Sequence, residues 1–416
     1  MNISRRQAVQ SLGLGGLSLL SPAAVLSAAS TRKKLPVAAV VTTYNRNSHA
    51  DVIVGKILEG WRQQGGPGPD LELVSLYTDQ VHKRDLSRGL AEKYGFRIAQ
   101  TIDEAVTLGQ DELPVAGVLS IGEHGDYPHN AVGQRLYPRR RFLDEIVAAM
   151  QRCGEFVPIF SDKHLSWNWR DAKHMVDLTK QHGIPFMAGS SLPVCWRYPA
   201  QELPLGSEIE DAMVVGYGDL EAYGFHGIEA LQCVLERRQG GETGVAAVTA
   251  LTGDQIWQAE KEKKWDRRLL QSALDTFDGS AERLEERLNP KKTVFYMIEY
   301  RDGLRATMAM LNGVSHQYAL ACRVREQAET FACWFRLEES KPFGHFEHLL
   351  RGIEHMIHTQ QAAYPVERTL LTTGILDKAM NSMHQQGKRL ETPELGIHYP
   401  ASTWGFANLH EENFPA

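Results

Sequence analysis

The chain has 416 residues, too many for one typical core, with 43% hydrophobic and 23% charged residues, as in globular proteins. Its net charge of −6 and the lack of a basic stripe argue against a nucleic-acid partner. The five cysteines are scattered without Cys-x-x-Cys spacing, so the sequence indicates neither a disulfide framework nor a zinc ribbon.

The first 30 residues have the pattern of an export signal. Arg5 and Arg6 precede a weakly apolar run, Leu12–Leu26, and the small residues Ser27–Ala29 offer a cleavage site. The paired arginines resemble a twin-arginine signal. An uncleaved anchor is the alternative, but the run is short for a membrane span. We therefore expect a periplasmic or otherwise exported protein whose mature chain has no integral membrane segment.

Strand and helix patterns alternate from residue 34 to residue 190. The predicted strands are Leu35–Thr43, Leu71–Tyr77, Phe96–Ala99, Val115–Ile121, Phe156–Phe160 and a short run before Gly189. The predicted helices between them include His49–Arg62, Lys83–Tyr94 and Arg141–Arg152. Such alternation is typical of βαβ units. We expect an α/β fold with an N-terminal, Rossmann-like parallel sheet domain over residues 34–190.

The pattern changes after residue 191. Thr293–Tyr300 and Leu304–Leu311 flank an Asp-Gly turn, which predicts a hairpin, and Tyr318–Val324 and Thr330–Leu337 predict two more strands. Three long helices are predicted over Asp254–Phe277, Phe346–Gln361 and Val366–Gln386. We expect residues 191–416 to form an α+β domain with an antiparallel sheet.

The first strand–helix junction is where a Gly-x-Gly-x-x-Gly loop would hold a dinucleotide. Residues 42–48 contain no glycine, which is evidence against ordinary dinucleotide binding. Hydroxyl, amide and guanidinium groups can still hold a phosphate at the helix N-terminus. The candidate groups are Thr42, Asn45, Arg46 and Ser48. Asp79 ends the second strand, where an acid either binds ribose hydroxyls or caps a turn.

Two further strand ends carry reactive side chains. Glu123 and His124 follow the fourth strand between two glycines, and Lys163 follows the fifth. The carboxyl ends of parallel strands meet at one sheet edge, so these loops are expected to line one site. The plainer alternatives are a polar loop and a lysine that only ends a strand. Arg139–Arg141 is interpreted as a solvated helix start rather than an anion site.

Two groups of histidines remain. His226 and Glu229 are neighbours if a helix has begun there, and His226 is either an acid–base group or a capping residue. Four other histidines share one face of a helix: His345, His348, His355 and His358. No carboxylate-bearing zinc motif accompanies them, so we predict no metal site.

The order of these strands, helices and motifs along the chain resembles that of the glucose–fructose oxidoreductase / inositol dehydrogenase (Gfo/Idh/MocA) family. The resemblance covers most of the mature chain. The motifs that carry the resemblance are Asp79, Tyr94-Gly95-Phe96, Thr101-Ile102-Asp103-Glu104-Ala105, Asp162-Lys163-His164, Gly224-Phe225-His226-Gly227-Ile228-Glu229, and the segment from Tyr364-Pro365 to Leu390. The resemblance implies a Rossmann domain, bound NAD or NADP, and hydride transfer at a sugar or cyclitol carbon. It also implies that residues 191–416 form a C-terminal α+β domain with an open antiparallel sheet that serves substrate binding or oligomerisation.

The resemblance also implies site residues. Lys163 corresponds to the lysine that contacts nicotinamide and substrate, and His226 to the acid–base or substrate-orienting histidine. The family's catalytic aspartate is replaced by Ala222, for which Glu221 or Tyr223 is the candidate substitute. We take Lys163, His226 and Tyr223 as the catalytic candidates. The cofactor-binding candidates are Thr42, Asn45, Arg46, Ser48, Asp79, Glu123, His124 and Lys163.

Three functions stay open. The first is an exported NAD(P)-dependent oxidoreductase of a sugar or cyclitol with a retained cofactor. The second is a glycosidase or lyase of the same fold that uses transient oxidation, and the third is a carbohydrate-binding protein without cofactor. A homo-oligomer is a further expectation, which follows from the open sheet face that the resemblance implies.

Overall fold

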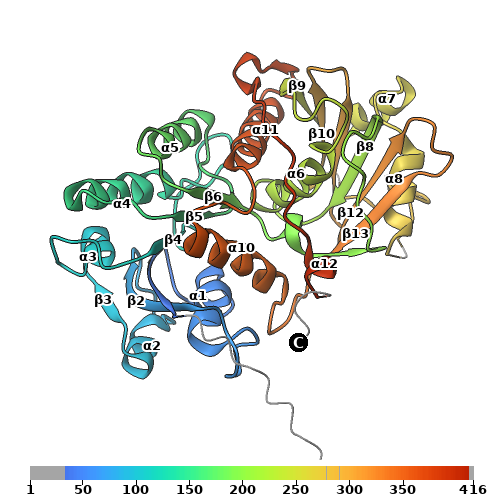
Figure 1. Cartoon of the computed structure of the whole chain (residues 1–416). Coiled ribbons are helices and arrows are strands. Elements are labelled where there is room, and N and C mark those ends of the chain that lie inside the picture. Colours follow the sequence, from blue (N-terminus) through green and yellow to red (C-terminus); the bar gives the residue numbers. More distant parts are fainter. Residues whose placement is uncertain (1–32, 278, 290, 412–416) are drawn as a thin grey trace, which may run out of the picture. The chain divides into compact units, whose positions relative to one another are not determined.

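The computed structural model describes residues 33–277, 279–289 and 291–411 (Figure 1). The predicted export signal lies outside them. Within these residues no helix is both long and apolar enough to cross a membrane.

The alternating first part forms a parallel sheet of six strands in the order β3-β2-β1-β4-β5-β6. The strands are β1 (Leu35–Val41), β2 (Leu71–Thr78), β3 (Arg97–Ala99), β4 (Gly117–Ile121), β5 (Ile159–Asp162) and β6 (Phe186–Gly189). The predicted parallel sheet is confirmed. The fifth strand starts later than expected because Pro158 lacks an N–H, although its carbonyl still accepts a hydrogen bond from the Val118 N–H.

Helices cover both faces of this sheet. They are α1 (His49–Glu59), α2 (Ser87–Tyr94), α3 (Ile102–Thr107), α4 (Arg139–Cys153) and α5 (Trp169–Gln181). In β1, Val37, Ala39 and Val41 pack with α1, whereas Ala38 and Val40 pack with α3, α4 and α5. A strand buried on both faces reads as a continuous apolar run, which explains why β1 is visible in the sequence.

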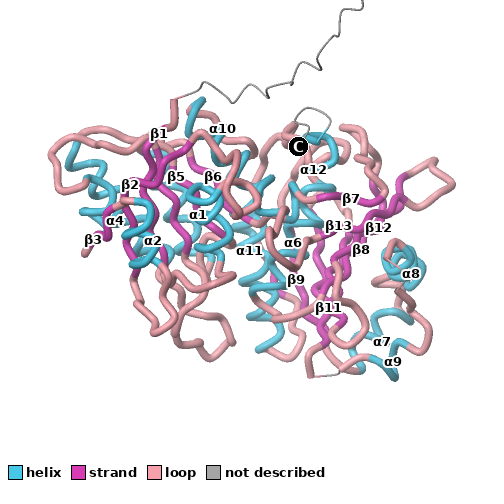
Figure 2. Tube along the Cα trace, turned by 90° about the horizontal axis from the view of Figure 1, so that it is seen from below, coloured by secondary structure: helices cyan, strands magenta, loops and turns pink. Residues whose placement is uncertain are grey.

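Helix α10 (His345–Thr359) also packs on the parallel sheet, beside α1, although it follows the second sheet in sequence (Figure 2). A chain segment from the predicted second domain thus completes the core of the first. The proposed division of the chain at residues 190 and 191 stays a prediction.

The second sheet has eight strands in the order β14-β9-β10-β11-β8-β12-β13-β7. They are β7 (Trp196–Tyr198), β8 (Ile209–Gly216), β9 (Val245–Leu251), β10 (Thr293–Tyr300), β11 (Arg305–Leu311), β12 (Tyr318–Val324), β13 (Phe331–Arg336) and β14 (Leu390–Glu391). The predicted β10–β11 hairpin is confirmed. All neighbouring pairs are antiparallel except β8 and β11, which run parallel.

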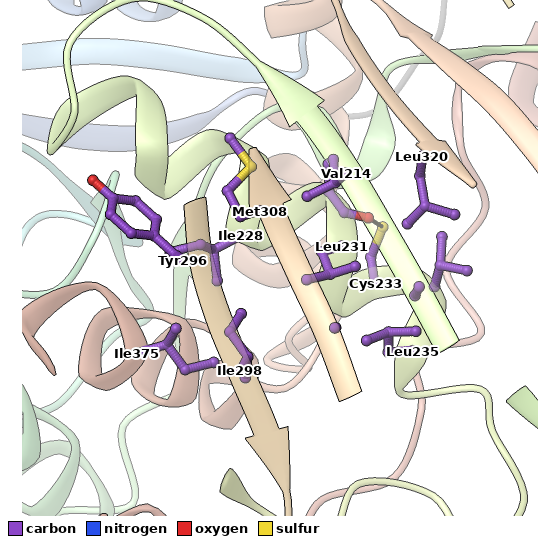
Figure 3. Packing of buried hydrophobic residues seen from close by; sticks show 14 of the residues in the cluster. Val214, Ile228, Leu231, Cys233, Leu235, Tyr296, Ile298, Met308, Leu320 and Ile375 are labelled. Atoms are coloured by element: carbon purple, nitrogen blue, oxygen red, sulfur yellow. Dashed lines mark hydrogen bonds between the residues drawn. The ribbon is translucent and has the colours of Figure 1, made fainter. Parts of the chain in front are cut away.

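One face of this sheet is covered by α6 (Ala222–Leu235) and α11 (Val366–His384). Figure 3 shows Ile228 and Leu231 of α6 lying against the strands that carry Val214 and Met308. The other face is covered by α7 (Asp254–Lys261) and α8 (Arg267–Asp275). Helices of the same chain therefore pack on both faces of this sheet, and the expected homo-oligomer stays a prediction.

The single helix predicted over residues 254–277 is wrong. It is two helices, because Asp266 caps α8 by accepting a hydrogen bond from the Arg268 N–H. The turn between them is fixed by the Trp265 indole N–H, which donates to the Ile256 carbonyl at 2.8 Å. The remaining short helices are α9 (Leu284–Arg287), α12 (Ala407–Glu411) and two 3₁₀ turns, Leu192–Val194 and Pro393–Leu395.

Candidate active site

Lys163 stands directly after β5 in a strained backbone conformation. Its φ is +69°, a left-handed value that costs a non-glycine residue about 1–2 kcal/mol. The Lys163 N–H donates to the Gly189 carbonyl at 3.0 Å, which fixes this turn to the end of β6. The side chain is buried, with 3% of its residue surface exposed. A strained backbone at a buried strand end makes this position a candidate functional site.

The Lys163 side chain reaches His226 on α6. Its Nζ lies 2.5 Å from His226 Nε2, and His226 Nδ1 lies 2.5 Å from Ser190 Oγ. Burial and the charge of Lys163 hold the pKa of His226 well below its ordinary value, so the imidazole is neutral. An ammonium can only donate, so Nε2 accepts and the proton on Nδ1 is donated to Ser190 Oγ. The predicted catalytic pair is in direct contact, and His226 lies inside its helix rather than at a cap.

Glu123 is the counter-charge of this site. Its Oε1 lies 3.9 Å from Lys163 Nζ, and its Oε2 accepts a 2.8 Å hydrogen bond from Arg139. Burial alone would raise the pKa of Glu123, but the charges of Lys163 and Arg139 outweigh it and hold the pKa below the ordinary value. Glu123 is therefore ionised and lies between two buried cations.

The interpretation of the arginine run as a solvated helix start is wrong for Arg139, which is completely buried. Arg139 lies under Gly122, where an added Cβ would come within 2.6 Å of the Arg139 Cγ. This glycine is needed because the arginine passes directly beneath the loop. Arg140 and Arg141 lie nearer the surface and pair with Asp171 and Asp79.

Glu229 supports the loop that carries Ser190. Its carboxylate is buried and accepts hydrogen bonds from Thr372 Oγ1 at 2.5 Å and from the Ser190 N–H at 3.3 Å. Burial raises the pKa of Glu229 to about 7. Glu229 is thus hydrogen-bonded to the loop of Ser190 and to α11, and these contacts give it a positioning role.

Tyr223 forms the open side of the site. It is 40% exposed, and its ring centre lies 6.0 Å from both Lys163 Nζ and the His226 ring. Glu221, the other candidate substitute at the Ala222 position, is buried, and its Oε2 accepts the Arg135 N–H at 2.7 Å. Burial raises the pKa of Glu221 to about 7. Of the two, only Tyr223 faces solvent beside Lys163.

A histidine–aspartate pair at this edge was not predicted from the sequence. His49, the first residue of α1, has its Nδ1 2.6 Å from Asp162 Oδ2 at the end of β5. Burial raises the pKa of Asp162 to about 6, and burial together with the Lys163 charge holds the pKa of His49 well below its ordinary value. The sequence feature that could have pointed to this pair is Asp162, the residue directly before Lys163.

The groups expected to hold a phosphate mostly bind other parts of the chain. Ser48 caps α1 by accepting the Asp51 N–H, and also accepts the Asn45 N–H at 3.2 Å. Thr42 Oγ1 donates to the Glu123 carbonyl at 2.5 Å. Arg46 is exposed. His124 is exposed as well, and its N–H donates to the phenol of Tyr137 at 3.1 Å.

Asp79, the expected ribose ligand, is also hydrogen-bonded to other residues of the chain. It accepts hydrogen bonds from the phenols of Tyr77 at 2.9 Å and Tyr127 at 2.6 Å, and from the guanidinium of Arg141. Burial alone would raise the pKa of Asp79, but these donors hold it below the ordinary value. Asp79 and the residues at the start of α1 are bonded within the chain, so they do not fit the ribose and phosphates of a dinucleotide while these contacts persist.

The four histidines of α10 have separate environments. His345 and His348 are buried, His355 lies against Trp404, and His358 Nε2 lies 3.0 Å from the Asp70 carbonyl oxygen. Over the described ranges, no group of three or more histidine, cysteine or acidic residues is arranged to hold a metal ion.

Comparison with known proteins identifies the fold. No protein-family model matches the sequence, and no curated protein matches it. Among solved structures, GenD2 from gentamicin A biosynthesis, in complex with NAD, has 13% identity and a TM-score of 0.55, covering 87% of this chain and 97% of its own. Apo scyllo-inositol dehydrogenase from Lactobacillus casei has 11% identity and a TM-score of 0.54, covering 86% and 98%.

A myo-inositol dehydrogenase from Corynebacterium glutamicum ATCC 13032 is similar to the same extent, with 13% identity, a TM-score of 0.52, and coverage of 86% of this chain and 98% of its own. At such identities the similarity establishes the fold. The resemblance expected from the sequence motifs is confirmed at that level: this chain has the fold of inositol dehydrogenases and related oxidoreductases.

Proposed function

We propose that this chain is an oxidoreductase-like enzyme that acts on a hydroxyl-bearing small molecule, a sugar or a cyclitol. The observation that carries the proposal is the contact of Lys163 with a neutral His226 at the carboxyl edge of the parallel sheet. Ligands of such sheets bind at this edge. The similarity of fold to two inositol dehydrogenases supports this substrate class.

The residues of this site supply the proton transfer that accompanies the oxidation or reduction of the substrate. Oxidation of an alcohol removes a proton from the hydroxyl oxygen, and reduction of a carbonyl adds one. Lys163 Nζ is the group that gives or takes this proton, and the neutral His226 Nε2 holds Lys163 in position and accepts from it. Ser190 Oγ fixes the imidazole by accepting from Nδ1. Tyr223, exposed beside Lys163, is the proposed contact to substrate.

NAD or NADP is part of the proposal, supported by the fold and by the NAD complex of GenD2. A second candidate is a sugar- or cyclitol-binding protein without dinucleotide. It is favoured by one observation, the saturation of Asp79 by Tyr77, Tyr127 and Arg141.

One experiment separates the two. Native protein is purified, its bound small molecules are identified by mass spectrometry, and NAD(P) reduction is measured with a panel of inositols and aldoses. Lys163→Ala should lower turnover by about 10²–10⁴-fold, the usual scale for an acid–base group. Lys180→Ala, on an exposed part of α5, is the matched control and should leave turnover unchanged. Sugar binding without bound nucleotide and without turnover would favour the second candidate.

Export also belongs to the proposal, on the pattern of residues 1–30. Free NAD(P) is scarce outside the cell, so an exported enzyme requires a retained cofactor that is returned to its starting state in the same site. Loading in the cytoplasm before folded-protein export satisfies that requirement.

A further inference from the structure

The loop between β4 and α4, residues 122–138, lies across the carboxyl ends of β1 and β2. Gln80, just after β2, is bonded on both sides of its amide to Asp126: Nε2 donates to the Asp126 carbonyl at 3.0 Å, and Oε1 accepts the Asp126 N–H at 2.8 Å. A Cβ added to Gly125 would lie 3.1 Å from Thr43 Cγ2. The β4–α4 loop is therefore bonded to the end of β2 through Gln80 and to the end of β1 through Thr42, whose Oγ1 donates to the Glu123 carbonyl.

Tyr127 of this loop is bound at the acid where a ribose would be recognised. In a parallel sheet of this kind, an acid at the end of the second strand accepts hydrogen bonds from ribose hydroxyls. Here Asp79 Oδ2 accepts a hydrogen bond from the Tyr127 phenol at 2.6 Å. The phenol presents to Asp79 the same chemical group, a neutral O–H donor, that a ribose hydroxyl presents.

The other end of the β4–α4 loop reaches the substrate side. The Arg135 N–H donates to Glu221 Oε2 at 2.7 Å, next to α6, and Gln134 Nε2 donates to Asp377 Oδ1 of α11 at 3.0 Å. The start of the loop carries Glu123, the counter-charge of Lys163. One segment thus binds the acid at the end of β2, carries the charge next to Lys163, and contacts the residue that precedes α6, the helix of His226.

From these contacts we infer that the β4–α4 loop is a built-in competitor of the nucleotide, with the Tyr127 phenol bound to Asp79 in place of a ribose hydroxyl. This inference rests on the proposed function. NAD or NADP binds only when Tyr127 and Asp126 leave Asp79 and Gln80. Because the same loop positions Glu123, displacement of the loop by nucleotide changes the surroundings of Lys163 as well.

Binding of ADP-ribose and NAD⁺ to the full chain, measured by isothermal titration calorimetry, tests the inference. Tyr127→Phe removes the phenol donor but keeps the ring, which packs 5.5 Å from the ring of Tyr137. Gln80→Ala removes the two bonds to Asp126 without changing Asp79. Each variant should lower the Kd for ADP-ribose about 10-fold or more, since a bond that holds the closed loop is lost.

Two controls make the result specific. Tyr94→Phe removes an exposed phenol that is bonded to Glu59 at 3.2 Å rather than to Asp79, and should leave the Kd unchanged. Asp79→Asn in the Tyr127→Phe background should weaken ADP-ribose again. Amide hydrogen exchange of residues 122–138 should rise when wild-type protein is saturated with ADP-ribose.

Three results are informative. Tighter binding by both variants supports the inference. An equal Kd for wild type, Tyr127→Phe and Gln80→Ala overturns it while the proposed function stands, because nucleotide then binds without displacing the loop. No binding to any variant overturns both the inference and the nicotinamide part of the proposed function.

Discussion

Replacing Lys163 by glycine and by alanine separates the effect of losing the ammonium group from the effect of the backbone strain at this position. The φ of +69° costs any residue with a Cβ about 1–2 kcal/mol, whereas glycine adopts it freely but loses about 0.5–1 kcal/mol through its more flexible unfolded chain. Lys163→Gly should therefore be more stable than Lys163→Ala by about 0.5–1 kcal/mol, as measured by urea unfolding. Both variants lose the same ammonium and leave Glu123 paired with Arg139.

Lys180, in the last turn of α5, is the matched comparison. There, in a helix, the order should reverse, with the alanine variant more stable than the glycine variant by about 1 kcal/mol. If Lys163→Ala were the more stable variant at position 163 too, the strain argument would be refuted.

The same variants test the electrostatics of the pair without a substrate. The charge of Lys163 is the second cause, after burial, of the lowered pKa of His226. Lys163→Ala should therefore raise the pKa of His226, which NMR titration of the imidazole can follow. An unchanged pKa would show that the ammonium does not act on His226. Full turnover of Lys163→Ala would remove its assigned chemical role.

Three further outcomes are expected. The pKa of Glu229 is raised from 4.5 to about 7 in the fold, so its contribution to stability is complete below pH 4.5 and is lost as pH rises through 7. Glu229→Gln should flatten the pH dependence of unfolding by at most about 3 kcal/mol in that window. Gly189→Ala should destabilise the fold by about 2–3 kcal/mol in thermal unfolding, because its φ is +121° and the new Cβ would lie 2.6 Å from Glu229 Oε2. Gly183→Ala, with φ +64° and nothing within 4 Å, should cost only about 1 kcal/mol, and equal costs would contradict the packing argument. Replacing Arg5 and Arg6 by lysine should trap full-length precursor in the cytoplasm on immunoblots, and normal periplasmic delivery would exclude the twin-arginine route.

The local sequence determined the alternating strands and helices, because β1 and β4 are apolar runs bounded by polar turns, and strands buried on both faces must be apolar. It also placed Lys163 at a strand end, and the β10–β11 hairpin followed from its Asp-Gly turn. It did not show the break between α7 and α8, since the helical pattern continues through residues 262–266.

Only the tertiary structure decided which side chains meet. His226 lies 63 positions after Lys163, and His49 lies 113 positions before Asp162, so their contacts depend on strand order and on the packing of α6 and α1. The sequence identified Asp79 as a candidate ribose ligand but could not show that Tyr127, 48 positions later, binds it. Local patterns specify elements because they reflect the burial of each residue, whereas hydrogen-bond partners across the chain are fixed only when the elements pack.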